Sequence, residues 1–202
     1  MAIIDKVVAA VTPMESEAAR REAHAKARTA AAGKDWLGQI LDHHEQIEDG
    51  FAAVKAAGDA AARRAAQLDL AILLNAHANA EEAVIYPALI HFGHKAHGTA
   101  GYAEQAGAKA NLGELEYLDP LSPEFLDKLE HVHGAVAHHV YEEENDRFLD
   151  LKQLPSAAQQ RLTDRYAEEF ERYTGQGPAS PVGDIPAGYV VGSHAPGRQA
   201  PG

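Results

Sequence analysis

A pattern of a histidine, two glutamates and an aromatic residue occurs twice in this chain with the same internal spacing. The copies are His77, Glu81, Glu82 and Tyr86, and then His139, Glu143, Glu144 and Phe148. A histidine and a glutamate four residues apart stand on the same face of an α-helix, so an imidazole nitrogen and a carboxylate oxygen can bind one ion. The repeat therefore predicts a metal site built from two helices. The second glutamates, Glu82 and Glu144, are expected to face outward or to support the ligands from behind.

Hydrophobic periodicity places both pairs on buried helix faces. In the helix expected over residues 59–85, His77 and Glu81 share the phase of the apolar residues, which recur every three or four positions. In a later helix that begins after Ser122, His139 and Glu143 do the same. Both pairs are thus predicted to point into the core.

The same phase decides between neighbouring candidates. His138 and Glu142 also have metal-binding spacing, but they lie off the apolar stripe of their helix. In the helix expected from residue 36 to 54, His44 lies on the stripe and His43 does not. His44 is therefore the predicted metal ligand of that helix.

A comparison of the two halves of the chain indicates an internal duplication. His77 and His139 are 62 residues apart, and His44 and Gln105 are 61 apart, so each half has a helix with one buried polar residue and then a helix with two. This organisation predicts an all-α fold, an antiparallel up-down-up-down four-helix bundle. The polar residues predicted to meet at one level of its core are His44, His77, Glu81, Gln105, His139 and Glu143.

Burying these groups together would cost several kcal/mol for each unpaired charge, and metal coordination removes that cost. The chain has no cysteine, which excludes disulfides, zinc–thiolate sites, iron–sulfur clusters and thiol nucleophiles. Imidazole and carboxylate ligands without thiolate suit iron, manganese or zinc.

The composition also narrows the range of partners. The formal net charge of -12 argues against binding to nucleic acid or to an anionic membrane surface. No run of about 18 apolar residues is present, as a membrane helix would need. The charges of Asp5 and Lys6 stand where a signal peptide would be apolar, which predicts a cytoplasmic protein.

The chain divides into four predicted segments. An Ala-rich helical leader covers residues 1–33, the bundle 34–153, and a C-terminal helix packed on the bundle 154–174. A flexible tail with seven Gly and five Pro covers 175–202.

Two interruptions are expected inside the bundle. Pro87 is predicted to end the second helix, because proline lacks the N–H group that a helix interior needs. The stretch from 90 to 100 is predicted to be a connection between helices. Its histidines, interpreted as loop residues, are His91, His94 and His97.

Over residues 36–151 the chain resembles the hemerythrin-like (HHE cation-binding) family, whose pattern is one His, then His-x-x-x-Glu, then one or two His, then a second His with a carboxylate. The resemblance implies a non-haem di-iron centre that binds oxygen or related small ligands, nitric oxide and peroxide among them. The residues that match the family's ligands are His44, His77, Glu81, His139 and Glu143.

The departure from the family pattern is Gln105, which stands where the family has a histidine. A carboxamide oxygen is a weaker ligand than imidazole, so one iron could be held loosely or completed by water. Alternatively, Glu104, Tyr102 or a loop histidine such as His97 could serve in its place.

Three functions fit these predictions. The first is a metal protein that binds, senses or handles a small diatomic or peroxide ligand. The second is a metal-dependent enzyme of peroxidase or iron-oxidase type, in which the weak Gln105 position supplies labile coordination. The third is a bundle that has lost one metal and has a structural or partner-binding role.

Overall fold

A computed structural model describes residues 15–175 of the 202-residue chain. Over that range every regular element is helical and no strand occurs, which confirms the predicted all-α class. The predicted tail lies outside the described residues except for Gly175, as do the first 14 residues of the predicted leader. None of the helices between residues 15 and 175 is long and apolar enough to span a membrane.

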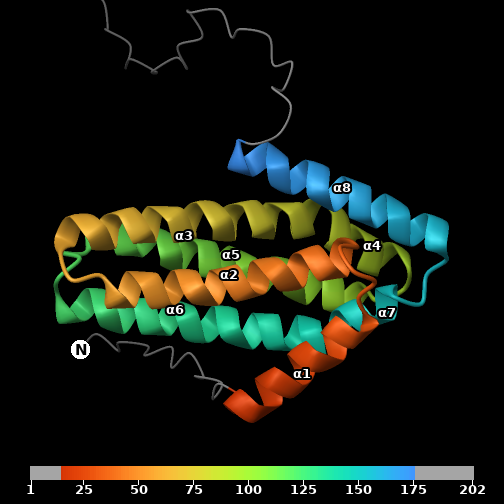
Figure 1. The fold of residues 1–202 in the computed structure, drawn as a ribbon, viewed down its shortest axis with the longest axis horizontal. Coiled ribbons are helices and arrows are strands. Elements are labelled where there is room, and N and C mark those ends of the chain that lie inside the picture. The colour runs from red at the N-terminus through yellow and green to blue at the C-terminus, as the bar shows by residue number, and fades with distance from the viewer. Residues whose placement is uncertain (1–14, 176–202) are drawn as a thin grey trace, which may run out of the picture.

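The central part of the fold is a bundle of four long helices (Figure 1). They are α2 (Trp36–Ala56), α3 (Ala60–Ala80), α5 (Lys95–Glu114) and α6 (Pro123–Glu142). Helix α2 packs against α3 and α6, and α5 also packs against α3 and α6, so the four helices surround one interior. Their apolar stripes fill that interior from both ends, with Leu37 and Ile40 in one cluster and Phe125 and Val132 in the other. The polar residues of the predicted site lie between.

Two further helices cover the bundle. Helix α1 (Glu17–Ala30) packs against α2 and the C-terminal end of the α6 run, and α8 (Ser156–Thr174) lies along α3 and α2 (Figure 1). Tyr166 of α8 is fully buried, and Ala23 and Ala27 give α1 its buried face. These helices close two sides of the bundle that the four long helices alone would leave to solvent.

Side-chain caps define where three of the helices begin. Asp35, Asp59 and Ser122 accept hydrogen bonds from backbone N–H groups in the first turns of α2, α3 and α6. Such caps satisfy donors that have no partner inside the helix. At the other end of α5 a short 3-10 helix, η2 (Leu115–Tyr117), leads into the turn before α6.

Helix α3 does not end at Pro87. It passes into a π turn, η1 (Glu81–Ile85), and continues as α4 (Tyr86–His91). The prediction that Pro87 ends this helix is wrong, because hydrogen bonds in the π turn run five residues back, as from Tyr86 N–H to the carbonyl of Glu81. That shift in register places proline in the first turn of a new α segment, where its missing N–H group is tolerated.

Helix α6 is extended in the same way. It passes into a second π turn, η3 (Glu143–Arg147), and then into α7 (Phe148–Leu151). The two halves of the bundle therefore share an element that the periodicity of the sequence did not reveal.

The connection after α4 is much shorter than the predicted stretch from 90 to 100. Only residues 92–94 separate α4 from α5, and Gly93 turns the chain with a φ of 99°. Gly98 is helical and buried, and a Cβ there would lie 2.6 Å from Ile90 Cγ1. The glycines that suggested a loop instead allow α5 to fold back tightly on α4, so His97 is a helix residue.

Candidate metal centre

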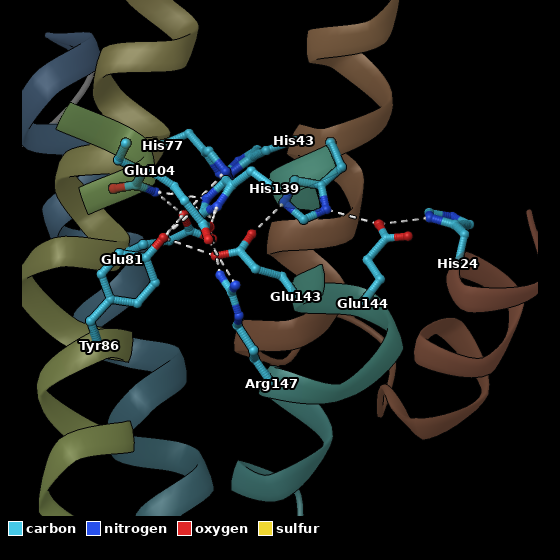
Figure 2. A network of polar contacts seen from close by, with 12 residues as sticks. His24, His43, His77, Glu81, Tyr86, Glu104, His139, Glu143, Glu144 and Arg147 are labelled. Atoms are coloured by element: carbon cyan, nitrogen blue, oxygen red, sulfur yellow. Dashed lines mark hydrogen bonds and ion pairs between the residues drawn. The ribbon is translucent and has the colours of Figure 1, made fainter. Parts of the chain in front are cut away.

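Four of the six predicted polar residues meet in one group at the middle of the bundle. His44 comes from α2, His77 from α3, and Glu81 and Glu143 are the first residues of the two π turns. One donor atom from each lies within 4.8 Å of the others, and all four residues are at most 3% exposed. Figure 2 shows the labelled members His77, Glu81 and Glu143 converging on the same space.

Glu143 occupies the centre of this group. Its Oε2 lies 3.5 Å from His44 Nε2, and its Oε1 lies 3.3 Å from His139 Nε2. Its two oxygens thus face imidazoles from different helices. Glu81 Oε2 lies 3.3 Å from His77 Nε2. Each carboxylate is therefore within reach of the ligand nitrogen four residues earlier, as the helical spacing predicts.

Several nitrogen and oxygen atoms that could bind a metal have no hydrogen-bond partner in the described part of the chain. These buried atoms are His44 Nε2, Glu81 Oε1, Gln105 Oε1 and Glu143 Oε2. Leaving a buried polar atom unsatisfied costs roughly 1–3 kcal/mol, and more when the group is charged. A cation bound where His44, Glu81 and Glu143 converge would give their unpartnered atoms a partner, so the residues present fit a bound metal.

The electrostatics of the group indicate the same need. Burial, and then the charge of Glu143, raise the pKa of Glu81 well above its usual value. Burial alone would lower the pKa of His44, but Glu143 and Glu144 outweigh it and raise that pKa to about 10. Burial and the charge of His44 hold the pKa of His77 well below its usual value. Burying these groups together thus shifts the pKa values of all three, and a cation bound among them would compensate the charge of the carboxylates.

The imidazole of His44 is oriented by a chain of polar groups that reaches α1. His44 Nδ1 lies 2.8 Å from Glu144 Oε1. The same oxygen lies 2.9 Å from His24 Nδ1, and Figure 2 shows the labelled Glu144 facing His24. Although burial opposes it, hydrogen bonding to both imidazoles lowers the pKa of Glu144 to about 2. A carboxylate behind a histidine ligand fixes the ring and strengthens the ligand. Glu144 therefore supports the centre from behind, one of the two positions expected for it.

The ring of His77 is held from α8. Tyr166 Oη lies 3.1 Å from His77 Nδ1 and 2.9 Å from His43 Nδ1. His43 therefore contacts Tyr166 and not the central group, and its ring stacks on Phe170 with centroids 3.8 Å apart. The choice of His44 over His43 from helix phase agrees with this arrangement.

His139 is oriented by a third carboxylate. Its Nδ1 lies 2.6 Å from Glu104 Oε2, and Arg147 donates to both oxygens of Glu104 at 2.7 and 2.9 Å. Burial would raise the pKa of Glu104, but hydrogen bonds from His139 and Arg147 lower it to about 2. Glu104 is therefore engaged behind His139 and does not take the place of Gln105.

Gln105 lies beside the group, on the predicted buried face of α5. Its Nε2 is 2.5 Å from Glu81 Oε2 and 3.5 Å from His139 Nε2. Two alternatives proposed for its position lie elsewhere: Tyr102 donates to the backbone carbonyl of Glu82, and His97 lies near acidic residues at the end of the bundle.

Sequence reasoning placed Tyr86 in the repeat but did not assign it to the site. Its Oη lies 2.8 Å from Glu143 Oε1, 3.3 Å from Glu81 Oε2 and 3.2 Å from His139 Nε2. Its ring lies directly against Gly101, where a Cβ would be 2.6 Å from the ring carbon Cζ. The available signal was the repeated pattern itself, because Tyr86 occupies the position that Phe148 has in the second copy.

A small cavity of about 30 Å³ adjoins the centre. Three of the predicted residues, His77, Gln105 and His139, form part of its wall. The rest is mainly apolar, with Ile47, Leu74, Ala108, Leu112 and Val136 among the lining side chains. This volume suits a molecule of about the size of water or a diatomic gas.

The polar contacts from His44 through Glu144 to His24 border a much larger cleft. The cleft holds about 790 Å³ between α1, α2 and α6, and its wall includes His24, His44 and Glu144. Charged residues such as Arg20 and Glu48 line it. The centre is thus bordered by an apolar cavity and, behind His44, by a polar cleft.

Fold and site together define a helical-bundle protein with a buried histidine–carboxylate cation site. The family model described as hemerythrin HHE cation binding domain matches residues 37–149. The chain belongs to this family. Membership implies metal binding, typically of iron, and the cluster of His44, His77, Glu81 and Glu143 fits such a site.

One curated relative is a DNA nickase of Nostoc sp. (strain PCC 7120), which is 34% identical to this chain over 98 residues. The match covers 48% of this chain and only 27% of the relative. The chain thus spans about a quarter of the length of that protein. No solved structure shows significant similarity to the chain.

Proposed function

We propose that this protein holds a pair of non-haem iron ions inside an up-down-up-down four-helix bundle and uses them to bind, sense or handle a small ligand. The observation that carries the proposal is the set of buried donor atoms without hydrogen-bond partners among residues 15–175. The proposed ligands are His44, His77, Glu81, His139 and Glu143, with Gln105 completing the site.

Each residue has a role that follows from its position. Glu143 faces two imidazoles with its two oxygens and would hold metal together with both of them. His44, His77 and His139 each present Nε2 to the centre while Nδ1 is held by Glu144, Tyr166 or Glu104. Tyr86 keeps a hydroxyl group next to both carboxylates. When bound, iron would supply redox chemistry toward a small ligand such as oxygen, nitric oxide or peroxide.

The apolar cavity supports a small neutral ligand. Its volume of about 30 Å³ suits a small molecule, and it offers few hydrogen bonds to water because most of the lining is aliphatic. His77, Gln105 and His139 bring it to the edge of the centre. A diatomic gas therefore fits this space better than a larger organic substrate does.

A metal-dependent oxidoreductase of peroxidase or iron-oxidase type is the second candidate. It is favoured by Gln105, whose neutral side chain stands where the family has imidazole and holds its cation less firmly. Iron-loaded protein that consumes oxygen or peroxide over many turnovers would establish this function. A stoichiometric, reversible optical change would instead identify a carrier or sensor.

Metal analysis tests the proposal against the third function, a bundle with a structural role. We expect two irons per chain in the iron-loaded wild type and a sharp loss in Glu81→Ala and His139→Ala. His138→Ala should keep its metal, because His138 is directed to Glu15 near the surface. Equal losses in all three variants, or a wild type that takes up no metal, would refute the proposed ligand set.

The proposed function does not include the DNA-nicking activity that the name of the Nostoc relative states. A nickase must approach the phosphates of DNA, and the net charge of -12 opposes that approach. We propose that the partner is a small molecule and not a nucleic acid or a membrane, and that the protein works in the cytoplasm.

A further inference from the structure

A second group of metal-ligating side chains lies at the end of the bundle where α4 turns into α5. His94 of this turn, His97 in the first turn of α5 and Asp150 of α7 each place one donor atom within 4.8 Å of the others, and all three are half-buried. Asp150 Oδ2 lies 2.8 Å from His94 Nδ1 and 3.6 Å from His97 Nδ1. Asp146 Oδ2 approaches the other side of the His97 ring, 3.8 Å from Nε2.

The backbone holds His94 in place for this purpose. His94 is the N-cap residue of α5, yet its side chain makes no capping hydrogen bond to the helix. Gly93, with its positive φ, allows the backbone N–H of His94 to bond the carbonyl of Leu89 at 2.8 Å. The imidazole is thereby directed away from the helix end and toward Asp150.

Two imidazole nitrogens share one carboxylate oxygen in this group. His97 Nδ1 is buried and lacks a hydrogen-bond partner in the described ranges, because Asp150 Oδ2 is 3.6 Å away and already close to His94. The two rings are stacked, with centroids 6.1 Å apart and planes inclined by 24°. An ion pair with Asp150 explains the position of His94. It does not explain why the imidazole of His97 also points at the same oxygen of Asp150.

We propose that His94, His97 and Asp150 form a binding site for a divalent transition metal such as Zn²⁺, separate from the bundle centre. Two imidazoles and one carboxylate are a ligand set typical of zinc, and the partial exposure of the site leaves a position for water or for Asp146. A bound ion fastens the start of α5 to α7. The Glu104–Arg147 ion pair behind His139 also joins α5 to the run of η3 and α7. The second site therefore stabilises the contact between the elements that position His139.

The test is zinc titration of the full chain after loading with iron. Wild type should bind one more Zn²⁺ per chain than the double variant His94→Ala/His97→Ala, and Asp150→Asn should weaken this Zn²⁺ by more than about tenfold. His91→Ala is the matched control, because His91 is an exposed histidine three residues from His94 and should leave zinc binding unchanged. Thermal unfolding with and without Zn²⁺ should show a Tm increase in wild type and His91→Ala only.

The proposal is overturned if the double variant binds as much zinc as wild type. It is also overturned if the double variant melts earlier than wild type by the same amount with and without Zn²⁺, which would identify an ordinary hydrogen-bonded contact. Both readouts compare variants outside the bundle centre, so they remain valid if the centre itself binds no iron. Conversely, loss of iron in Glu81→Ala should not alter this zinc site.

Discussion

Gln105 and Tyr86 give this centre its individual character at the scale of single residues. Where the family pattern has an imidazole, this chain presents a carboxamide, and the phenol of Tyr86 lies among Glu81, His139 and Glu143. A neutral amide binds a cation more weakly than imidazole does. The side of the site formed by Gln105 and His139 is therefore the side where one cation should be held less firmly.

Replacing Gln105 with histidine tests this directly. We expect Gln105→His to tighten the weaker metal by tenfold or more, equivalent to about 1.4 kcal/mol, because imidazole is the stronger ligand. Chelator competition with iron measures the change. Gln105→Leu, which keeps the size but removes the donor atoms, should lower the affinity, and unchanged affinity in both variants would place Gln105 outside the coordination sphere.

Helix phase was sufficient to predict which residues of each helix face the centre. The six predicted polar residues are all buried, and His43 and His138 lie outside the central group, because an amphipathic helix fixes its inner face through local spacing alone. Tyr166 and His24 could not be predicted in this way. Their contacts depend on how helices distant in sequence cross, and no local periodicity encodes that geometry.

The π turns are the decisive feature at the scale of elements. Each begins at a proposed glutamate ligand, and each widens the helix where the polar group must be accommodated. π turns are rare and recur at functional sites. The long helices could be predicted because their apolar stripes are regular. No local pattern indicated the π turns, so Pro87 was misread as a helix end.

Gly101 of α5 is expected to be essential for the placement of Tyr86. A Cβ at this position would lie 2.6–2.9 Å from atoms of the Tyr86 ring, so Gly101→Ala should force the ring away from the centre and cost roughly 1–3 kcal/mol of unfolding free energy. Gly107→Ala on the exposed face of the same helix is the control. No atom lies within 4 Å of the position that a Cβ would take there, so this change should be neutral or stabilising by up to about 1 kcal/mol. Denaturant unfolding of both variants decides, and equal effects would contradict this packing.

Asp35 should make the stability of α2 depend on pH. Burial opposes its ionisation, but hydrogen bonds from Lys152, Gly38 and Ala32 outweigh this and lower the pKa of Asp35 below 3.8. The charged form therefore stabilises the fold above pH 3.8, and this contribution is lost as the pH falls through the folded-state pKa. Because Asn caps a helix about as well as Asp does, Asp35→Asn should lower the unfolding free energy at pH 7 only through the lost charged contact with Lys152, by about 0.3–1 kcal/mol.

The difference between Asp35→Asn and wild type should shrink as the pH is lowered below 3.8. Denaturant unfolding at a series of pH values measures it. Asp59→Asn is a suitable control, because Asp59 caps α3 by accepting a hydrogen bond from Ala62. A deficit in Asp35→Asn that stays constant from pH 7 to pH 2 would show that the charge of Asp35 contributes nothing.

At the scale of the whole molecule, the fold encloses a charged centre in apolar surroundings. The bundle supplies the ligands, while α1 and α8 add His24 and Tyr166, which hold Glu144 and His77 in place. Without a cation, the centre would bring two carboxylates and several imidazoles together at the cost of their hydration. A bound metal would make this arrangement favourable. The fold is therefore best explained as one that brings metal-binding side chains together in its core.

Anomalous diffraction at the iron absorption edge, from crystals of iron-loaded protein, tests this account most directly. We predict two adjacent peaks inside the bundle, bordered by Glu81 and Glu143 and within coordination distance of His44, His77 and His139. An iron-loaded crystal with no peak among these side chains would contradict the account.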